Sequence, residues 1–368
     1  MIKCIRLSSP WFGDEEIEAA AIVLRSQKVS MGNEVKQFEI ELSEFFQNYN
    51  VTCVSSCTAA LQLALQAFEI GAGDEVLVPT FTFVATFQAI SATGAKPIPC
   101  DIDLDDAFID VDDADSKITS KTKAIVPVPF AGCDRKMWKV QELAQRNGLS
   151  VIVDAAHCFG HEDLSPSDIV WCFSFDAIKN VSCIDGGAIV TTNQKITDKV
   201  KDVRLLGVID DTDKRFHGKR SWDFDVTEQG WRYHMNDLCA AVGRAQLAKF
   251  PVIRERRRNN ARIYMEHLRN IPNIQLFPID VERTVPHIFP IIIKDGLRNV
   301  LQKSLMESGI ETGVQYKPNH LLTYYRPPYN LPKAMQLYES ILSIPVHPML
   351  TEEDVMFIVD NIKHLATV

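Results

Sequence analysis

The chain has 368 residues, of which 46% are hydrophobic and 24% are charged, and its formal net charge is −9 at pH 7. This length predicts two structural units, one large and one small, and the composition is that of a folded globular protein. The acidic balance argues against a protein that binds nucleic acid or an anionic membrane surface.

Strand-like and helix-like segments alternate along the first two-thirds of the chain. Short apolar runs predict strands at 51–55, 74–79, 96–101, 123–128 and 149–154, another around Trp171 and another at 188–191. Helices are predicted at 59–68, 82–93 and 135–146, the last of them ended by Gly148. This order indicates βαβ units and an α/β fold, in which a mostly parallel sheet, covered on both faces, carries ligands at the carboxyl ends of its strands.

The last third of the chain has a different pattern. An arginine-rich helix is predicted at 253–268 and a strand at 285–293, followed by further helices and strands. We therefore divide the chain into a large domain, residues 1–248, and a smaller C-terminal α+β domain, residues 249–368. The arginine cluster at 254–258 is interpreted as the wet face of its helix, because it is short and isolated in an acidic protein.

The cysteines and the N-terminus bear on the cellular compartment. The nine cysteines are odd in number and form no CxxC pair, and no second pair follows Cys53 and Cys57 at the spacing of a zinc site. The start of the chain lacks the apolar core of a signal peptide, and no run approaches the length of a membrane span. We expect a soluble, cytoplasmic protein with reduced thiols and no metal site.

Lys179 is the first candidate functional residue. It lies between the predicted strand around Trp171 and the Asp185-Gly186-Gly187 segment that leads into the next strand. A lysine at a strand end can lose enough hydration to become a nucleophile toward carbonyl groups. Alone, however, a loop lysine is most often a solvated charge, so its interpretation depends on other segments.

Four other segments supply the remaining parts of one site. The hydroxyls of 55–58 open a helix, where free N–H groups favour an anion. Asp154 ends a buried strand, where a carboxylate needs a cationic partner such as a protonated pyridine nitrogen. Phe83 could lie on a flat ring, and Ser174 could point at a phosphate. Separately these residues could be helix caps and core, but together they predict a pyridoxal phosphate (PLP) site.

Several stretches of the chain resemble the DegT/DnrJ/EryC1/StrS family of sugar aminotransferases. The resemblance covers almost the whole length and rests on residues 71–76, 79–86, 94–97, 122–128, 154–157, 173–175, 179–180, 186–188, 235–241 and 343–351. It implies the PLP enzyme architecture called fold type I, with a large PLP-binding α/β/α domain and a smaller C-terminal α+β domain.

The resemblance also implies roles for individual residues. Lys179 is similar to the lysine that binds the cofactor covalently and moves the substrate proton, and Asp154 to the partner of the pyridine nitrogen. His157 matches the position near the 3-hydroxyl, and Phe83 the stacking aromatic. The phosphate-binding positions fall on Cys57, Thr58 and Ser174.

Two further roles concern the partner subunit and the substrate. The resemblance implies a homodimer with shared active sites, in which His234 falls where the family reaches the phosphate bound by the partner. Arg232 stands two residues earlier, and either side chain could make this contact. Tyr316 and His320 resemble the C-terminal segment that contacts the substrate. The implied substrates are glutamate and a nucleotide-linked keto sugar.

The chain departs from the family pattern at several places. Cys57 stands where the family usually has glycine, which leaves the phosphate contact intact unless this position needs a positive φ. The hairpin between His157 and Phe173 is shortened to 160–168, so any substrate contact from it is in doubt.

Three alternatives to amino transfer fit these residues less well. Family members that dehydrate sugars carry histidine at the position of Lys179, so lysine favours transamination. An inactive PLP-fold binding protein would have no chemical need for Lys179 or Asp154. A metal site at His157, His161 and Glu162 would need a helix, which nearby glycine and proline disfavour.

Overall fold

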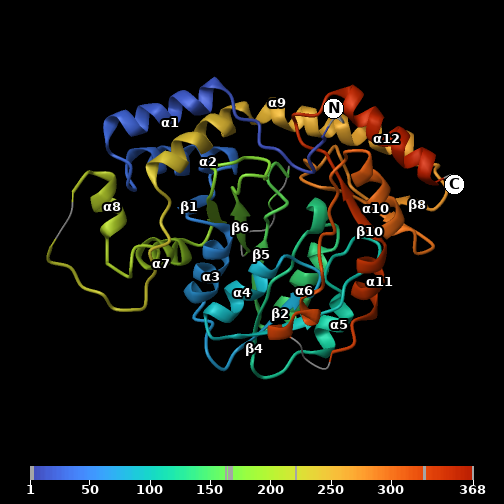
Figure 1. The fold of residues 1–368 in the computed structure, drawn as a ribbon. Helices are drawn as coiled ribbons and strands as arrows, with labels where there is room; N and C mark the ends of the chain where they lie inside the picture. The colour runs from blue at the N-terminus through green and yellow to red at the C-terminus, as the bar shows by residue number, and fades with distance from the viewer. Residues whose placement is uncertain (1–3, 162–163, 165–168, 220–221, 326–328, 367–368) are drawn as a thin grey trace.

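The computed structural model describes residues 4–161, 164, 169–219, 222–325 and 329–366. Two units lie along one long helix, α9 (Asp237–Leu268), with the larger unit at one end and the C-terminal unit at the other (Figure 1). None of the helices in these ranges combines the length and the apolarity needed to cross a membrane.

The larger unit is built on a seven-stranded sheet. Its order is β1 (Asn50–Val54), β7 (Gly187–Thr191), β6 (Val170–Ser174), β5 (Ser150–Asp154), β4 (Thr122–Ile125), β2 (Glu75–Pro79) and β3 (Lys96–Cys100). The pairs from β6 to β3 are parallel, and β7 runs antiparallel to both of its neighbours. The mostly parallel α/β sheet predicted from the sequence is therefore confirmed.

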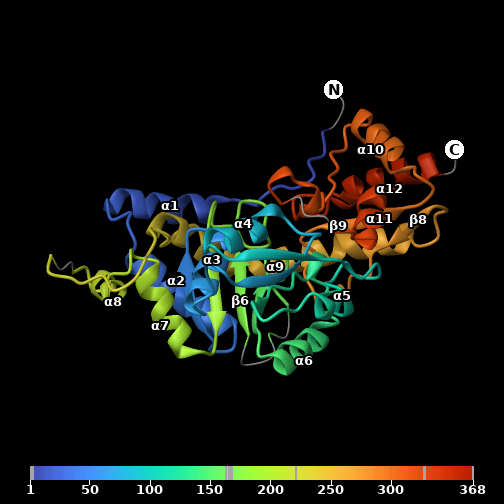
Figure 2. The same ribbon diagram turned by 90° about the horizontal axis from the view of Figure 1, so that it is seen from below.

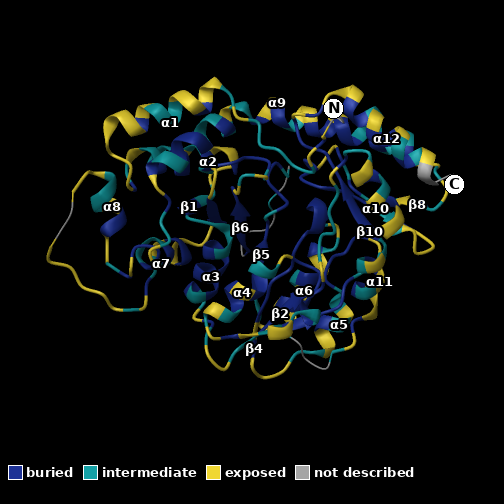
Figure 3. Ribbon diagram, in the orientation of Figure 1, coloured by how far each residue is buried: buried dark blue, intermediate teal, exposed yellow. Residues whose placement is uncertain are grey.

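Helices cover both faces of this sheet. One face packs against α2 (Asn33–Phe45) and α6 (Met137–Asn147), and the other against α3 (Cys57–Ala67), α4 (Val84–Ala92) and α7 (Gln194–Val203). Successive strand residues alternate between the two cores, as Val153 and Ile152 do. Burial on both faces explains why the strands read as continuous apolar runs, and Figure 3 shows them buried.

The C-terminal unit has a smaller antiparallel sheet. Its order is β10 (Ile341–Ile344), β9 (Phe289–Ile293) and β8 (Ile274–Leu276), and its helices are α10 (Arg298–Glu307), α11 (Pro332–Ser340) and α12 (Glu352–Ala366). Strand β9 starts four residues later than the predicted strand at 285–293. The reason is that backbone carbonyls at 284–287 accept hydrogen bonds from side chains and not from a neighbouring strand.

The two units are joined at several places. Helix α9 runs unbroken through residues 248 and 249, with Pro251 inside it, so the predicted domain boundary lies within a shared helix. The start of the chain also crosses over, because Ile5 forms a parallel bridge with Ile310 and belongs to the core of the C-terminal unit. Helix α1 (Asp14–Ser26) then returns to pack on α9.

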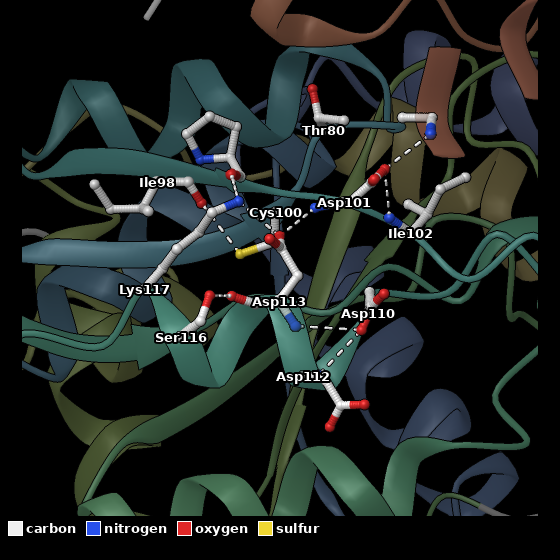
Figure 4. Close-up of polar contacts among 12 residues, drawn as sticks. Thr80, Ile98, Cys100, Asp101, Ile102, Asp110, Asp112, Asp113, Ser116 and Lys117 are labelled. Carbon is white, nitrogen blue, oxygen red and sulfur yellow. Dashed lines mark hydrogen bonds and ion pairs between the residues drawn. The ribbon is translucent and has the colours of Figure 1, made fainter. Parts of the chain in front are cut away.

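An acidic cluster after β3 braces the two units (Figure 4). The Asp101 carboxylate accepts hydrogen bonds from the backbone N–H groups of Lys333 and Ala334, at 3.1 and 2.8 Å, in the first turn of α11. The N–H of Asp101 donates to the Asp113 carboxylate of α5 (Val111–Ser116) at 2.6 Å, and Lys117 Nζ lies 2.6 Å from the same oxygen. One carboxylate of the large unit therefore caps a helix of the C-terminal unit.

A segment around α8 (Asp211–Phe216) projects from the larger unit (Figures 1 and 2). We call residues 208–219 and 222–230 the α8 arm. It is closed at its base by bridges that pair Leu205 with Arg232 and Val208 with Val226. Trp222 is 91% exposed and Phe224 is 55% exposed, so the arm carries large apolar side chains into solvent.

Candidate active site

A cavity of about 460 Å³ lies at the carboxyl ends of the parallel strands. It is lined by side chains that follow β1, β2, β5 and β6, the edge at which parallel sheets bind ligands. The predicted site residues that line it are Cys57, Thr58, Phe83, Asp154, His157, Ser174, Lys179 and Tyr316. Segments that are more than 250 residues apart in the sequence thus meet in one cavity.

Asp154, at the end of β5, is the buried acid of this cavity. The Thr86 hydroxyl on α4 donates to its Oδ2 at 2.7 Å, and the Ala156 N–H donates to its Oδ1 at 3.2 Å. Burial raises the pKa of Asp154 above that of an exposed carboxyl, and these hydrogen bonds act in the opposite direction. Among the described residues no lysine, arginine or histidine forms an ion pair with it within 4.0 Å, so the site has room for a cationic partner.

The N-terminus of α3 forms the anion-binding end of the cavity. Ser56 is the N-cap, and its side chain accepts from the N–H of Ala59 at 3.1 Å. The helix start rests directly on β7, because a Cβ added to Gly187 would lie 2.6 Å from the N atom of Cys57. Ser174, buried at the end of β6, lines the same cavity. Helix N–H groups and a hydroxyl therefore converge where a phosphate could bind.

Cys57 replaces the usual glycine without strain. It is the first residue of α3 and does not adopt a positive φ, so its backbone N–H keeps the helical orientation. Its Sγ lies 3.3 Å from the carbonyl oxygen of Cys172 and 3.9 Å from Oδ1 of Asp154. Burial raises the pKa of this thiol well above its usual range, which keeps it protonated.

Lys179 lines the same cavity as Asp154. It stands in the turn that follows β6, and burial lowers the pKa of its amine, with Asp154 acting in the opposite direction. Its Nζ lies 3.1 Å from Nε2 of His287, which reaches the cavity from the C-terminal unit. The lowered pKa favours the neutral amine that nucleophilic and proton-transfer chemistry needs.

His157, Tyr316 and Phe83 form an aromatic side of the cavity. Nε2 of His157 lies 3.0 Å from the Tyr316 hydroxyl, and Nδ1 accepts a hydrogen bond from the N–H of Ala131 at 3.3 Å. Burial lowers the pKa of His157 well below its usual range, so the neutral ring carries its proton on Nε2. Phe83 is 56% exposed at the cavity rim, with its ring centroid 5.8 Å from that of Tyr316.

Two predicted site residues, His320 and His234, lie outside this cavity lining. Nδ1 of His320 is 2.8 Å from Oγ1 of Thr80, so its ring joins the C-terminal unit to β2. His234 pairs through its backbone with Val54, and burial lowers its pKa to about 4. The substrate contact of His320 and the partner contact of His234 stay predictions.

Two residues of the site were not predicted from the sequence. Thr86 lies within a stretch that supported the family resemblance, but its hydroxyl had no assigned role. His287 lies in a segment that was interpreted only as a strand. The sequence shows only that His287 is a polar residue at the start of an apolar run. Its role in the site depends on how the C-terminal unit packs on the large unit.

The alternative metal site can be compared with the geometry in part, because Glu162 and most of 160–168 lie outside the described residues. His161 Nε2 lies 2.7 Å from the carbonyl oxygen of Gly132, and the His157 ring contacts Tyr316. Within the described ranges, no three His, Cys, Asp or Glu side chains are grouped as metal ligands.

Comparisons with known proteins agree with this geometry. An uncharacterized protein of Methanocaldococcus jannaschii is 34% identical over 97% of this chain and 96% of its own length. The structure is similar to Spr1654 from Streptococcus pneumoniae in its PMP form, with a TM-score of 0.92, 27% identity and coverage of 99% of this chain and 98% of that one. Spr1654 has also been solved in a PLP form.

Two further solved structures extend the comparison. Helicobacter pylori PseC, an aminotransferase of pseudoaminic acid biosynthesis, has a TM-score of 0.91 and 27% identity, with coverage of 99% and 100%. The sugar aminotransferase CalS13 from Micromonospora echinospora has a TM-score of 0.89 and 26% identity, again with coverage of 99% and 100%. The profile of the DegT/DnrJ/EryC1/StrS aminotransferase family matches residues 10–363. The chain therefore belongs to the DegT/DnrJ/EryC1/StrS aminotransferase family.

Proposed function

We propose that this protein is a PLP-dependent aminotransferase that moves an amino group from glutamate to a nucleotide-linked keto sugar. One observation carries the proposal: the Lys179 amine, with a pKa lowered by burial, shares a cavity with the buried carboxylate of Asp154. Structural neighbours that act as sugar aminotransferases support the substrate class.

The residues of the cavity fit PLP. Asp154 is a buried carboxylate with space for a cationic partner, which the protonated pyridine nitrogen would supply. The N-terminus of α3 with Thr58, and Ser174 opposite, would hold the phosphate. Phe83 offers an apolar ring for stacking, and His157 a neutral N–H donor near the 3-hydroxyl.

PLP held in this cavity would supply an electron sink for the electron pair left when a proton is removed from the amino acid. The chain's own residues provide the rest. Lys179 would take up and return that proton on Nζ, because burial lowers its pKa and favours the neutral amine. The Asp154 carboxylate would keep the pyridine nitrogen protonated, and the Thr86 hydroxyl, which donates to Oδ2, fixes the orientation of that carboxylate.

The substrate would enter on the side of Tyr316 and Phe83. Both side chains line the cavity, and Phe83 stands at its exposed rim. Tyr316 is held by His157, so its hydroxyl has a defined position from which to contact a sugar. His320, behind this segment, would support it through Thr80.

A homodimer with shared sites completes the proposal. The exposed Trp222 and Phe224 of the α8 arm are the kind of surface that a second copy would cover. Nδ1 of His234 is buried and has no hydrogen-bond partner among the described residues, which is consistent with a contact supplied by assembly. The nine free cysteines fit a cytoplasmic protein.

The test is spectroscopic. The purified protein with PLP should absorb in the blue-violet, lose this absorbance on addition of glutamate with release of 2-oxoglutarate, and regain it with the correct keto sugar. A panel of nucleotide-linked keto sugars would identify that substrate, and Lys179→Ala serves as the control that cannot return to the starting spectrum. A protein that does not take up PLP, or whose spectrum does not respond to any amino donor, would exclude this function.

A further inference from the structure

The Lys179 amine has a neighbour from the C-terminal unit. Nζ lies 3.1 Å from Nε2 of His287, whose ring is buried and lines the same cavity. We propose that His287 is a positioning residue, which accepts a hydrogen bond from Lys179 and fixes its amine in the cavity during amino transfer. This inference rests on the proposed function and adds to it a residue that the family resemblance did not assign.

The direction of the hydrogen bond follows from the chemistry of the two side chains. When Lys179 is an ammonium it has only donors, so in that state Nε2 of His287 accepts and the neutral ring carries its proton on Nδ1. Burial, Lys179 and His157 all lower the pKa of His287, so the ring stays neutral and keeps its acceptor. Nδ1 is buried and has no hydrogen-bond partner among the described residues.

The unpartnered Nδ1 supports a role for the other nitrogen. A buried donor without a partner is unfavourable, and most proteins avoid it. An apolar side chain of similar volume would fill the same space without that cost. The presence of a histidine at position 287 is therefore better explained by the contact of Nε2 with Lys179 than by packing.

The segment that carries His287 is held rigidly against Lys179. Asn180, the next residue after the lysine, donates from Nδ2 to the carbonyl oxygen of Val285 at 2.9 Å. Arg257 on α9 donates to the carbonyl oxygens of Pro286 and His287, at 3.2 and 3.3 Å. These hydrogen bonds join the segment that carries Lys179 to the segment that carries His287. They limit how far the amine and the ring can move relative to each other.

Several charged or titratable groups influence the pKa of Lys179, and His287 is one of them. They come from β5 and its following turn, from the start of α3, from the turn after β6, from α9 and from the C-terminal unit, and are Asp154, His157, Cys57, Asp176, Arg257 and His287. A neutral acceptor stabilises the ammonium form more than the amine. Removing the His287 acceptor should therefore lower the pKa of Lys179 further.

The first experiment measures the pKa of the Lys179 amine in the protein without bound cofactor. The full-length protein, freed of cofactor, is labelled with acetic anhydride between pH 6 and 10, and the extent of labelling at Lys179 is read by mass spectrometry. In His287→Leu the midpoint should fall by roughly half a unit to one unit. His287→Asn, whose amide oxygen can accept, should lie closer to the wild type.

His347 provides a matched control. It is as buried as His287, lies in the C-terminal unit, has one ring nitrogen bonded to the Arg6 carbonyl oxygen and has an Nδ1 that is likewise without a partner in the described chain. His347→Leu should leave the labelling midpoint of Lys179 unchanged. Thermal melting of each variant checks that the fold is retained, and His287→Asn keeps the test valid if the leucine variant does not fold.

The second experiment measures the half-reaction of the PLP-loaded protein with glutamate. His287→Leu should slow the rate constant by roughly 10- to 100-fold, with the dissociation constant for glutamate nearly unchanged, because a misplaced reacting group lowers the rate more than binding. An unshifted midpoint in His287→Leu, or an unchanged rate, would overturn the positioning role. Failure of the wild type to react with glutamate would instead overturn the proposed function, whatever the labelling shows.

Discussion

At the scale of single residues, the electrostatics of the site depend on how Asp154 is held. Its carboxylate is buried, which raises its pKa, and the Thr86 hydroxyl at 2.7 Å stabilises the charged form. The two influences oppose each other. Thr86 thus keeps Asp154 ionised at a lower pH than burial alone would allow, which extends the pH range in which it can hold a positive ring nitrogen.

Replacement of Thr86 by valine tests this balance. The variant loses the donor, so the pKa of Asp154 should rise further, and the acid limb of the pH profile of kcat/KM should move to higher pH. At neutral pH we expect kcat/KM to fall by about tenfold, which corresponds to the free energy of one hydrogen bond to a charged group. Ser91→Ala, on the same helix but bonded to Phe87 and Tyr325, is the control. A profile in Thr86→Val that overlays that of the wild type would contradict the role.

Much of the site could be read from single positions in the sequence. Asp154 and Ser174 end strands of the mostly parallel sheet, and Thr58 and Lys179 follow strands, so these positions lie at one edge of the sheet. His287 could not be found in this way. Its place depends on how the C-terminal unit packs onto the large sheet, and neither periodicity nor motif spacing encodes that contact.

At the scale of elements, the contact between Asp101, which follows β3, and the start of α11 stabilises the packing of the two units. Asp101 satisfies N–H groups at the start of α11, which belongs to the other unit. Its own N–H is held in turn by Asp113, so the cap has a fixed direction. The helix therefore begins where the large unit dictates.

Asp101→Ala should lower the free energy of unfolding by about 1–2 kcal/mol, as expected for loss of an N-cap. Chemical denaturation measures the change. Lys333→Ala is the matched control, since its ion pair with Asp110 joins the same helix to the same unit but is half exposed, and it should cost less than about 1 kcal/mol. Equal effects of the two substitutions would show that the charge pair, and not the cap, holds α11.

The elements themselves were predicted unevenly. The buried strands of the large sheet have clear apolar runs, and all seven were predicted, whereas the helices α1, α2, α5, α7 and α8 were not. In α1 the apolar pattern is divided between a face on α9 and exposed side chains such as Ile17 and Ile22, so no single periodic stripe marks the helix. The predicted helix at 253–268 covers only the second half of α9, which begins at Asp237 and continues through Pro251.

At the scale of the whole molecule, the α8 arm is the most conspicuous departure from a closed surface. It extends away from the larger unit in both views and exposes two aromatic side chains, Trp222 and Phe224 (Figures 1 and 2). It returns to the body at Arg232 and His234, next to the strand that leads to the anion-binding end of the cavity. Assembly and catalysis would therefore depend on the same segment.

A double variant of Trp222→Asp and Phe224→Asp should weaken the dimer, because it places charges in a surface expected to be buried between subunits. Light scattering after size exclusion measures the mass of the double variant in solution. The specific activity of this variant should fall on dilution. Met306→Asp, at a residue 67% exposed on α10, is the control and should change neither. A wild type that is monomeric and fully active would contradict shared sites.

The pairing of Ile5 with Ile310 has a consequence for the order in which the chain can fold. The N–H of Ile5 donates to the carbonyl oxygen of Gly309 at 2.8 Å, and its carbonyl accepts from the N–H of Glu311 at 2.9 Å. Ile5 is thus synthesised some three hundred residues before the segment with which it pairs. The core of the C-terminal unit is therefore complete only when both Ile5 and Ile310 have been synthesised, and Figure 1 shows the two labelled termini at that unit.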